Sequence, residues 1–249
     1  CFLDSRKSKA MAKKSKKSSE KWSGGVVRID TADKQRLILK PQQQHNLSMA
    51  PNRAVLLCGP PNRGKSATCL QIAAFSAPFH KVFVLHGTPG TIEYDCIDHT
   101  LLPSMPDPEF WKEQSKAAKG KPILCIVDDY SCEGLDKTER RNMEMMLRTC
   151  CSHLGILCLI TCHAHTNLAP KWRRCCTTHI VWPPADRSSW GYLARGMNLT
   201  QKQLTAAFNR CKESPLGKHS FVIYEQDAPA GRPPCRIDAE YEFDVDLFS

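Results

Sequence analysis

The sequence predicts an α/β fold with a mostly parallel central sheet, flanked by helices and extended by added edge strands near the C-terminus. From residue 54 onward, short apolar runs alternate with helical patterns, as expected of βαβ units. A glycine-rich turn from Gly59 to Ser66 separates one apolar run from a helix-favouring run. Another apolar run ends in the acidic pair Asp128-Asp129. With 249 residues, the chain is long enough for one sizeable domain of this class.

Each element follows from a local pattern. Strands are predicted over residues 54–58, 81–86, 123–127, 156–161 and 179–182, with a short strand within 26–39 and edge strands over 220–225 and 236–243. Helices are predicted over 67–75, near 108–118, over 138–153 and over 200–211. The third helix has Asp136 as N-cap and Glu139 placed as in a capping box. Its apolar face comprises Met143, Met146, Leu147, Cys150 and Leu154.

Charge and composition divide the chain into a basic tail (1–22), a lead-in segment (23–50) and the α/β domain (51–249). The tail has eight basic and two acidic residues, so it carries +6 of the net charge of +10. With almost nothing apolar to bury, it is expected to be disordered. Contact with nucleic acid, a nuclear-import signal and a solvated tail are all open interpretations. Because Met11 opens Met-Ala-Lys-Lys, residues 1–10 are a candidate for non-native upstream sequence.

Composition also bounds the class of protein. Hydrophobic residues make up 41% of the chain, yet no apolar stretch approaches the length of a membrane span, so no membrane partner is expected. The 14 cysteines include no Cys-x-x-Cys pair and follow no secretory leader, which favours reduced thiols. A zinc site is the less favoured alternative, because alternate residues of a strand point to opposite faces. Its possible ligands are Cys158, Cys162, His163, His165, Cys175, Cys176 and His179.

The turn after the first strand has the pattern G-x-x-x-x-G-K-S, typical of a phosphate-binding loop. Glycines let the backbone curl so that N–H groups and the next helix N-terminus face the phosphates of ATP. Lys65 is predicted to reach the β- and γ-phosphates, and Ser66 to offer its hydroxyl to Mg²⁺. A merely structural turn is the alternative. The predicted nucleotide contacts are Gly59, Pro60, Pro61, Asn62, Arg63, Gly64, Lys65, Ser66 and Ala67.

The acidic pair is the expected partner of this loop, because open α/β sheets bind ligands at the carboxyl ends of their strands. Asp128 is predicted to hold Mg²⁺ together with Ser66, and Asp129 to orient or deprotonate the attacking water. His163, at the end of the next strand, is the predicted γ-phosphate sensor, and His165 competes with it. The alternative is that the two acids only cap a turn and that the histidine only forms a hydrogen bond at the end of its strand.

Phosphoryl transfer in a ring of subunits usually needs an arginine supplied by a neighbouring subunit. Arg148, Arg173 and Arg174 are the candidates, and nothing in the sequence chooses among them. Arg140 and Arg141 are expected on a solvated helical face.

Beyond the acidic pair, the chain reads Leu-Gly-Ile-Leu-Cys-Leu-Ile-Thr-Cys-His up to residue 163 and Asn-Leu-Ala-Pro-Lys-Trp-Arg over residues 167–173. With the phosphate loop, Asp-Asp and the Glu93-Tyr94 pair after the second strand, residues 50–225 resemble the poxvirus-type genome-packaging ATPases of double-stranded DNA viruses. These belong to the FtsK/HerA superfamily of P-loop NTPases. The family usually has glutamine at the position of His163, and smaller residues at Pro61 and Arg63.

The resemblance implies an ATP- and Mg²⁺-dependent motor that forms a ring of identical subunits and pumps double-stranded DNA into a preformed capsid. It implies a capsid or portal vertex partner, Arg173 as a trans-acting arginine, and a location in the host nucleus or a cytoplasmic virus factory, with transient presence at the virion vertex. A viral replication helicase is one alternative. A non-hydrolysing, ATP-dependent DNA-binding or capsid-assembly factor is the other, and a small P-loop kinase is disfavoured for want of an arginine-rich lid.

Overall fold

The computed structural model describes residues 47–76, 78–87, 93–130, 135–228, 234–238 and 241–242. The predictions for the basic tail, for the strand within 26–39 and for most of the lead-in segment fall outside these residues. No helix in the described ranges is both long and apolar enough to cross a bilayer.

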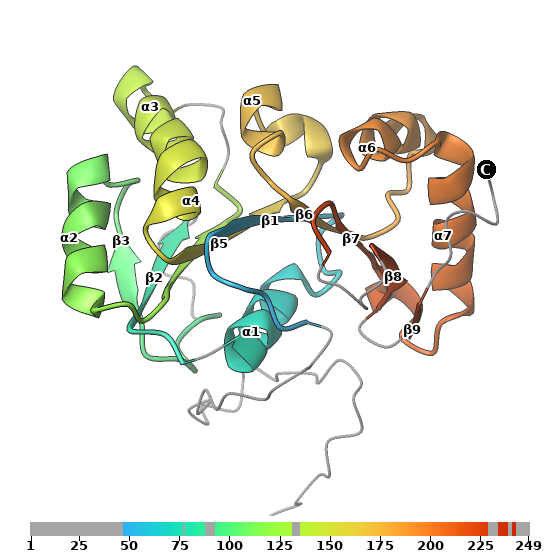
Figure 1. Ribbon diagram of the computed structural model, residues 1–249. Coiled ribbons are helices and arrows are strands. Elements are labelled where there is room, and N and C mark those ends of the chain that lie inside the picture. The colour runs from blue at the N-terminus through green and yellow to red at the C-terminus, as the bar shows by residue number, and fades with distance from the viewer. Residues whose placement is uncertain are drawn as a thin grey trace, which may run out of the picture.

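The predicted α/β class is confirmed: a nine-stranded sheet has the order β3-β2-β4-β5-β1-β6-β7-β8-β9 (Figure 1). The first six strands in this order, β3, β2, β4, β5, β1 and β6, pair in parallel. Strands β7, β8 and β9 are added antiparallel at the β6 edge. The strands are β1 (Arg53–Cys58), β2 (Lys81–His86), β3 (Thr100–Leu102), β4 (Ile123–Asp128), β5 (Ile156–Cys162), β6 (Thr178–Val181), β7 (Val222–Glu225), β8 (Cys235–Ile237) and β9 (Tyr241–Glu242).

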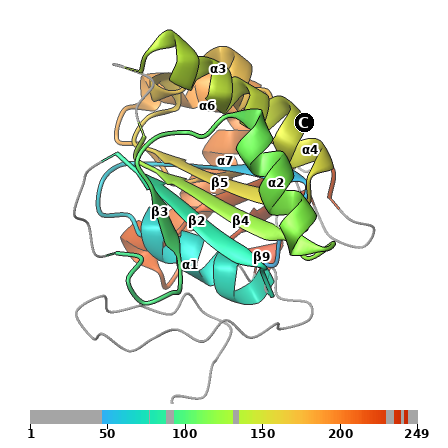
Figure 2. The same cartoon turned by 90° about the vertical axis from the view of Figure 1, so that its left-hand side faces the viewer.

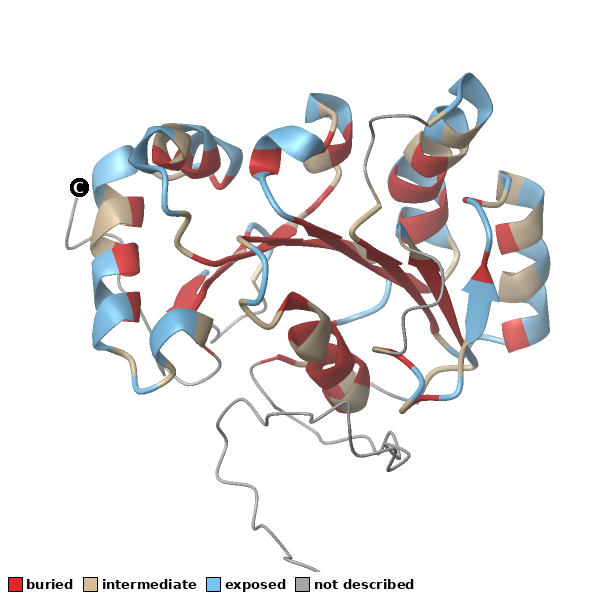
Figure 3. Ribbon diagram, turned by 180° about the vertical axis from the view of Figure 1, so that it is seen from behind, coloured by how far each residue is buried: buried red, intermediate tan, exposed pale blue. Residues whose placement is uncertain are grey.

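Helices cover both faces of this sheet (Figures 1 and 2). Helix α1 (Lys65–Ser76) covers one face, and most of the other helices lie on the opposite side. Burial on both faces explains why β4 and β5 are mostly apolar, with every residue buried (Figure 3). The remaining α-helices are α2 (Pro108–Ala118), α3 (Lys137–Met145), α4 (Cys151–His153), α5 (Pro170–Arg173), α6 (Trp190–Gly196) and α7 (Gln201–Glu213).

The core therefore has two apolar layers, one on each side of the sheet. Alternate strand residues contribute to each layer, as the pleat requires. Val55 and Leu57 of β1 pack with Leu70 and Ile72 of α1, whereas Leu56 belongs to the opposite layer. The same alternation decides which polar side chains at the strand ends lie on the same face of the sheet.

The predicted helix over 138–153 is a helical segment made of three parts. Helix α3 passes into a π-helical turn, Met146–Cys150, and then into α4. The carboxylate of Asp136 accepts the N–H of Glu139 at 2.8 Å, as expected of an N-cap. The predicted capping box does not form, because the Glu139 carboxylate instead accepts the hydroxyl of Tyr130 at 2.8 Å. A tertiary contact has replaced the local one.

Other elements differ from the sequence-based prediction. No pattern in the sequence predicts β3, α5 or α6; β3 has only three residues, and Leu101 within it is 59% exposed. The single edge strand expected over 236–243 is two short strands, because Asp238 between them has φ = 54°, a left-handed conformation that ends a strand.

Candidate functional site

The glycine-rich loop joins the buried strand β1 to helix α1. Asn62 and Gly64 have positive φ angles of 57° and 93°, which let the backbone of the loop curl. A Cβ on Gly59 would lie 2.6 Å from Cβ of Trp182, so no side chain fits there. The hydroxyl of Thr68 donates to the carbonyl of Gly64 at 2.9 Å and holds the loop to the first turn of α1. The loop is thus fixed from both ends.

Lys65, the first residue of α1, is folded back into this loop. Its side chain is buried, and Nζ donates to the carbonyls of Gly59 (3.0 Å) and Pro60 (3.2 Å). Nζ also lies 3.1 Å from Nδ1 of His163. Because an ammonium group can only donate, Nδ1 must accept, and the imidazole carries its proton on Nε2. Nε2 lies 3.3 Å from Oδ2 of Asp129, so His163 joins Lys65 to Asp129.

Asp128, at the end of β4, is almost completely buried, with 1% exposure. Its Oδ2 accepts the hydroxyls of Ser66 (3.0 Å) and Tyr94 (2.7 Å), and its Oδ1 accepts the hydroxyl of Thr161. Burial, followed by the nearby Cys69 and Asp128, raises the pKa of Tyr94 well above its usual value, so the phenol keeps its proton and can donate. Three hydroxyl donors therefore hold a carboxylate beside the loop.

Asp129 has a backbone that few residues other than glycine adopt, with φ = 48°. Its N–H donates to the hydroxyl of Thr161 at 2.9 Å, which holds this turn against β5. A Cβ on Gly87 would lie 2.3 Å from the carbonyl oxygen of Asp129, so only glycine permits this close approach. A costly conformation held by its surroundings is a recurring feature of functional sites. Here it directs the carboxylate toward His163.

These residues surround a cavity of about 310 Å³. It is lined by Pro61, Asn62, Gly64, Lys65, Ser66, Ala67, Leu70, Glu93, Asp129 and His163. Glu93 also lies 3.2 Å from Nε2 of His86. Within the described residues, the one converging group of three or more possible metal ligands is His86, Glu93 and Asp128, whose ligand atoms lie within 4.8 Å of one another. The seven cysteines and histidines considered for zinc are not that group.

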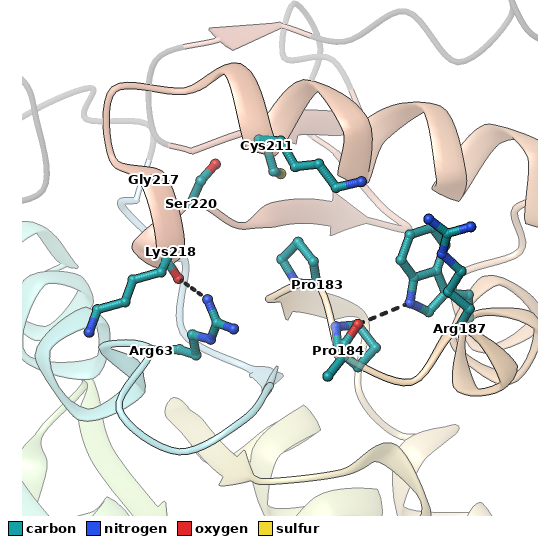
Figure 4. A pocket seen from close by; sticks show the side chains of 11 residues that line it. Arg63, Pro183, Pro184, Arg187, Cys211, Gly217, Lys218 and Ser220 are labelled. Carbon is teal, nitrogen blue, oxygen red and sulfur yellow. Dashed lines mark hydrogen bonds between the residues drawn. The ribbon is translucent and has the colours of Figure 1, made fainter.

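A second cavity of about 530 Å³ is lined by Arg63 of the loop and by residues of the segments 183–190 and 211–220 (Figure 4). Arg63 of the loop donates to the carbonyl of Lys218 at 3.0 Å, and Trp190 donates to the carbonyl of Pro184 at 3.3 Å. Nδ1 of His219 donates in turn to the carbonyl of Arg63 at 3.2 Å. The loop is therefore tied to the segment between α7 and β7. The charged side chains lining this cavity, Arg63, Arg187, Lys212 and Lys218, are all cations.

The predicted site residues thus fall into two groups. Lys65, Ser66, Asp129 and His163 line the first cavity, and Asp128 is buried beside it in contact with Ser66. By contrast, His165 and the candidate arginines make their contacts elsewhere. Arg173 donates to the carbonyl of His165 at 2.6 Å, and Arg148 is 64% exposed and pairs with Glu144 at 3.2 Å. Arg174 is exposed.

Tyr94, Thr161, His86 and Glu93 contribute to the site without a predicted role. In the sequence, the Glu93-Tyr94 pair stands out only as part of the family resemblance, which assigns it no role. Thr161 donates the third hydroxyl hydrogen bond to Asp128. Its position as a polar residue near the end of an apolar strand could have identified it from the sequence.

The strand order defines the class of fold. Strand β5 lies between β1, which carries the loop, and β4, which ends in the acidic pair. This is the arrangement of a P-loop NTPase fold, and the chain has it together with the G-x-x-x-x-G-K-S loop.

Comparisons with known proteins find likeness in structure alone. No family model matches the chain, and no curated protein sequence matches it. The DNA-packaging ATPase B204 of Sulfolobus Turreted Icosahedral Virus is 15% identical, with 76% of this chain and 98% of that chain covered and a TM-score of 0.48. The genome-packaging NTPase B204 of Sulfolobus turreted icosahedral virus 2, in complex with ATP-gammaS, is 14% identical over 76% and 98%, with a TM-score of 0.49.

A third similar structure is the cytoplasmic domain of the type VII secretion ATPase EccC of Thermomonospora curvata, which is 12% identical over 78% of this chain and 26% of that chain, with a TM-score of 0.49. At identities below 25% and TM-scores below 0.5, these likenesses say nothing of the function of this chain.

Proposed function

We propose that this protein is an ATPase that binds and hydrolyses ATP at the cavity between the phosphate loop, Asp128-Asp129 and His163. The observation that carries the proposal is the hydrogen-bonded series from Lys65 through His163 to Asp129. It links the group that would bind the terminal phosphates to the carboxylate that would activate water. A structural turn needs no such series.

The residues beside the loop fit Mg²⁺, which prefers oxygen ligands. Ser66 and Asp128 offer a hydroxyl and a carboxylate 3.0 Å apart, and Glu93 adds a second carboxylate at the same cavity. When bound, Mg²⁺ would neutralise charge on the phosphates. The protein's own part is to orient Asp128 through the hydroxyls of Tyr94 and Thr161 and to hold Asp129 in its left-handed turn.

The second cavity extends this proposal to the rest of the nucleotide. When the phosphates of ATP lie along the loop with the γ-phosphate beside Asp129, the base and ribose lie at the side of the loop that faces away from β4. The cavity beyond β6 lies there, and Pro183 and Pro184 offer an apolar surface beside four cations. We assign the base and ribose of ATP to this cavity.

More specifically, we propose that ATP hydrolysis drives translocation of double-stranded DNA and so packages a viral genome into a preformed capsid. It is supported by the resemblance to poxvirus-type members of the FtsK/HerA superfamily and by the net charge of +10, which suits a polyanionic partner. A ring of identical subunits, a capsid or portal vertex partner, and a host nuclear or virus-factory location belong to this same proposal.

Steady-state ATP hydrolysis, with and without long double-stranded DNA, tests the proposal. Lys65→Ala should abolish turnover, whereas the matched surface variant Lys116→Ala should behave as wild type, because Lys116 is exposed on α2. DNA should stimulate the wild-type enzyme. If the protein binds ATP and DNA but wild type and Lys65→Ala share the same background turnover, the ATPase proposal is wrong.

The alternative function is a factor that binds ATP without turnover. Asp129→Asn separates the two, because the substitution preserves shape and removes the base. An ATPase should lose turnover and retain ATP binding in this variant, whereas a non-hydrolysing factor should show no change in any ATP-dependent property. A replication helicase would separate labelled strands of a forked duplex; a packaging motor would not.

A further inference from the structure

A cavity of about 350 Å³ opens beside helices α5 and α6, which lie on the side of the sheet opposite α1 (Figure 1). Three of its lining residues are arginines: Arg173, Arg174 and Arg195. The described residues that line it include no carboxylate, and none of the three arginines forms an ion pair with a described residue. Some arginines elsewhere form ion pairs, as Arg53 does with Glu225 and Arg210 with Glu213.

The three guanidinium groups are held in different ways. Nη1 of Arg173 donates to the carbonyl of His165 at 2.6 Å and lies 3.1 Å from its Nδ1. The guanidinium of Arg195 stacks on the ring of Tyr192 at 4.8 Å, and Tyr192 is 57% exposed. Arg174 is exposed at the end of α5. The site therefore has one anchored cation and two that remain available to an incoming anion.

His165 contacts Arg173 but adds no negative charge to the cavity. A guanidinium only donates, so Nδ1 accepts from Arg173 and the ring proton is on Nε2, for which no partner exists among the described residues. Burial, and then Arg173, lowers the pKa of His165 to about 4, so the ring is neutral near pH 7. A Cβ on Gly196 would lie 2.9 Å from Nε2, so Gly196 packs closely against the ring. The guanidinium groups of Arg173, Arg174 and Arg195 and the Nε2–H of His165 are therefore all donors.

We propose that Arg173, Arg174, Arg195 and Tyr192 form a binding site for the backbone phosphates of double-stranded DNA. Guanidinium groups match phosphate oxygens in shape and charge, and an exposed tyrosine hydroxyl can donate to the same groups. The inference rests on the proposed function, because DNA is the phosphate-bearing partner that this function supplies. Contacts to backbone phosphates alone would make the binding independent of sequence.

The position of this site in the chain gives it a direct connection to ATP. Only Ala164 separates His163, which contacts Lys65 and Asp129, from His165, which contacts Arg173. A change at the ATP site that moves His163 therefore moves the segment that anchors Arg173. A motor requires such a connection between its nucleotide and its track.

The test compares Arg174→Ala/Arg195→Ala with the matched control Arg141→Ala/Arg210→Ala in the full chain. All four side chains are exposed, so both variants should fold, and both remove two positive charges. DNA affinity is measured by fluorescence anisotropy with a labelled mixed-sequence duplex over a range of salt concentrations. The first variant should bind about tenfold more weakly, with a slope of log K against log salt lower by about 2, because each phosphate contact contributes about 0.9. The control should match wild type.

Three outcomes would overturn the inference. If wild type binds no DNA at any salt concentration, the proposed function fails and the inference fails with it. If wild type binds but both variants keep its affinity and slope, the inference alone fails. If the first variant keeps its DNA binding and loses DNA-independent ATP turnover, the arginines act on the nucleotide of a neighbouring subunit and not on DNA.

Discussion

Replacing His163 with alanine removes the side chain that joins Lys65 to Asp129. Neither partner is left buried without a hydrogen bond, because Lys65 keeps the carbonyls of Gly59 and Pro60, and the Asp129 side chain is 33% exposed. His163 itself is 44% exposed, so the free energy of unfolding should change by less than about 0.5 kcal/mol. The affinity for ATP should stay within about threefold of wild type, because Lys65 and the loop are intact.

Turnover should respond very differently. A positioned general base contributes about 10²- to 10⁴-fold to a rate, and His163→Ala removes what positions Asp129 rather than Asp129 itself. We therefore expect the lower end of that range, a loss of about 10²-fold, equivalent to about 2.7 kcal/mol in the activation free energy. Asp129→Asn should lose more. The double variant should lose little beyond Asp129→Asn alone, because residues that act as a unit are not additive.

Single-turnover hydrolysis at saturating ATP measures the rate, and a fluorescent ATP analogue measures the affinity. His153→Ala is the control, because His153 is an exposed histidine at the end of α4. The reasoning would be refuted if His163→Ala lost as much ATP affinity as turnover, since His163 would then serve only to hold Lys65. The reasoning would also be refuted if the double variant lost turnover by the full product of the two single losses.

Three further predictions concern stability, each measured by urea unfolding. Tyr94→Phe should lower the free energy of unfolding by about 1.5–3 kcal/mol, because it removes a donor from the buried Asp128 carboxylate, and an unchanged value would contradict that hydrogen bond. Gly59→Ala should cost about 1–3 kcal/mol through overlap with Trp182, and equal stability would show that the loop can shift. Burial lowers the pKa of His179 from 6.5 to about 4, so the unfolded chain binds the extra proton and stability falls by about 3 kcal/mol as the pH drops from 6.5 to 4. His179→Gln should flatten that decline, and an equally steep decline in the variant would assign it to other groups.

The parts of the site that the sequence predicts are those set by local spacing. The loop from Gly59 to Ser66 needs its glycines and its position between strand and helix, and both are visible in the chain. Asp128-Asp129 follows directly from the end of an apolar run. The paired strands of the sheet were recognisable for the same reason, since burial on both faces requires continuous apolar residues.

The parts that the sequence does not predict depend on which strands are neighbours. His86 lies opposite Asp128 because β2 and β4 pair in that register. Thr161 reaches both aspartates because β5 lies beside β4. Neither contact can be found from spacing along the chain. The left-handed turn at Asp129 is likewise imposed by Gly87 and Thr161, which are distant in sequence.

Alternation along the strands explains why His163 reaches the site and His165 does not. On β5, the even-numbered residues up to Cys162 pack in the layer opposite α1, and Leu157 and Leu159 pack in the layer with α1. Thr161 and His163 continue the second set, so they emerge on the face where α1 begins and where Lys65 and Ser66 lie. His165 has the same parity, but a 3₁₀ turn (His165–Asn167) begins there, and the two-residue period no longer applies. The two histidines thereby serve two different cavities, and the end of β5 is the point at which they separate.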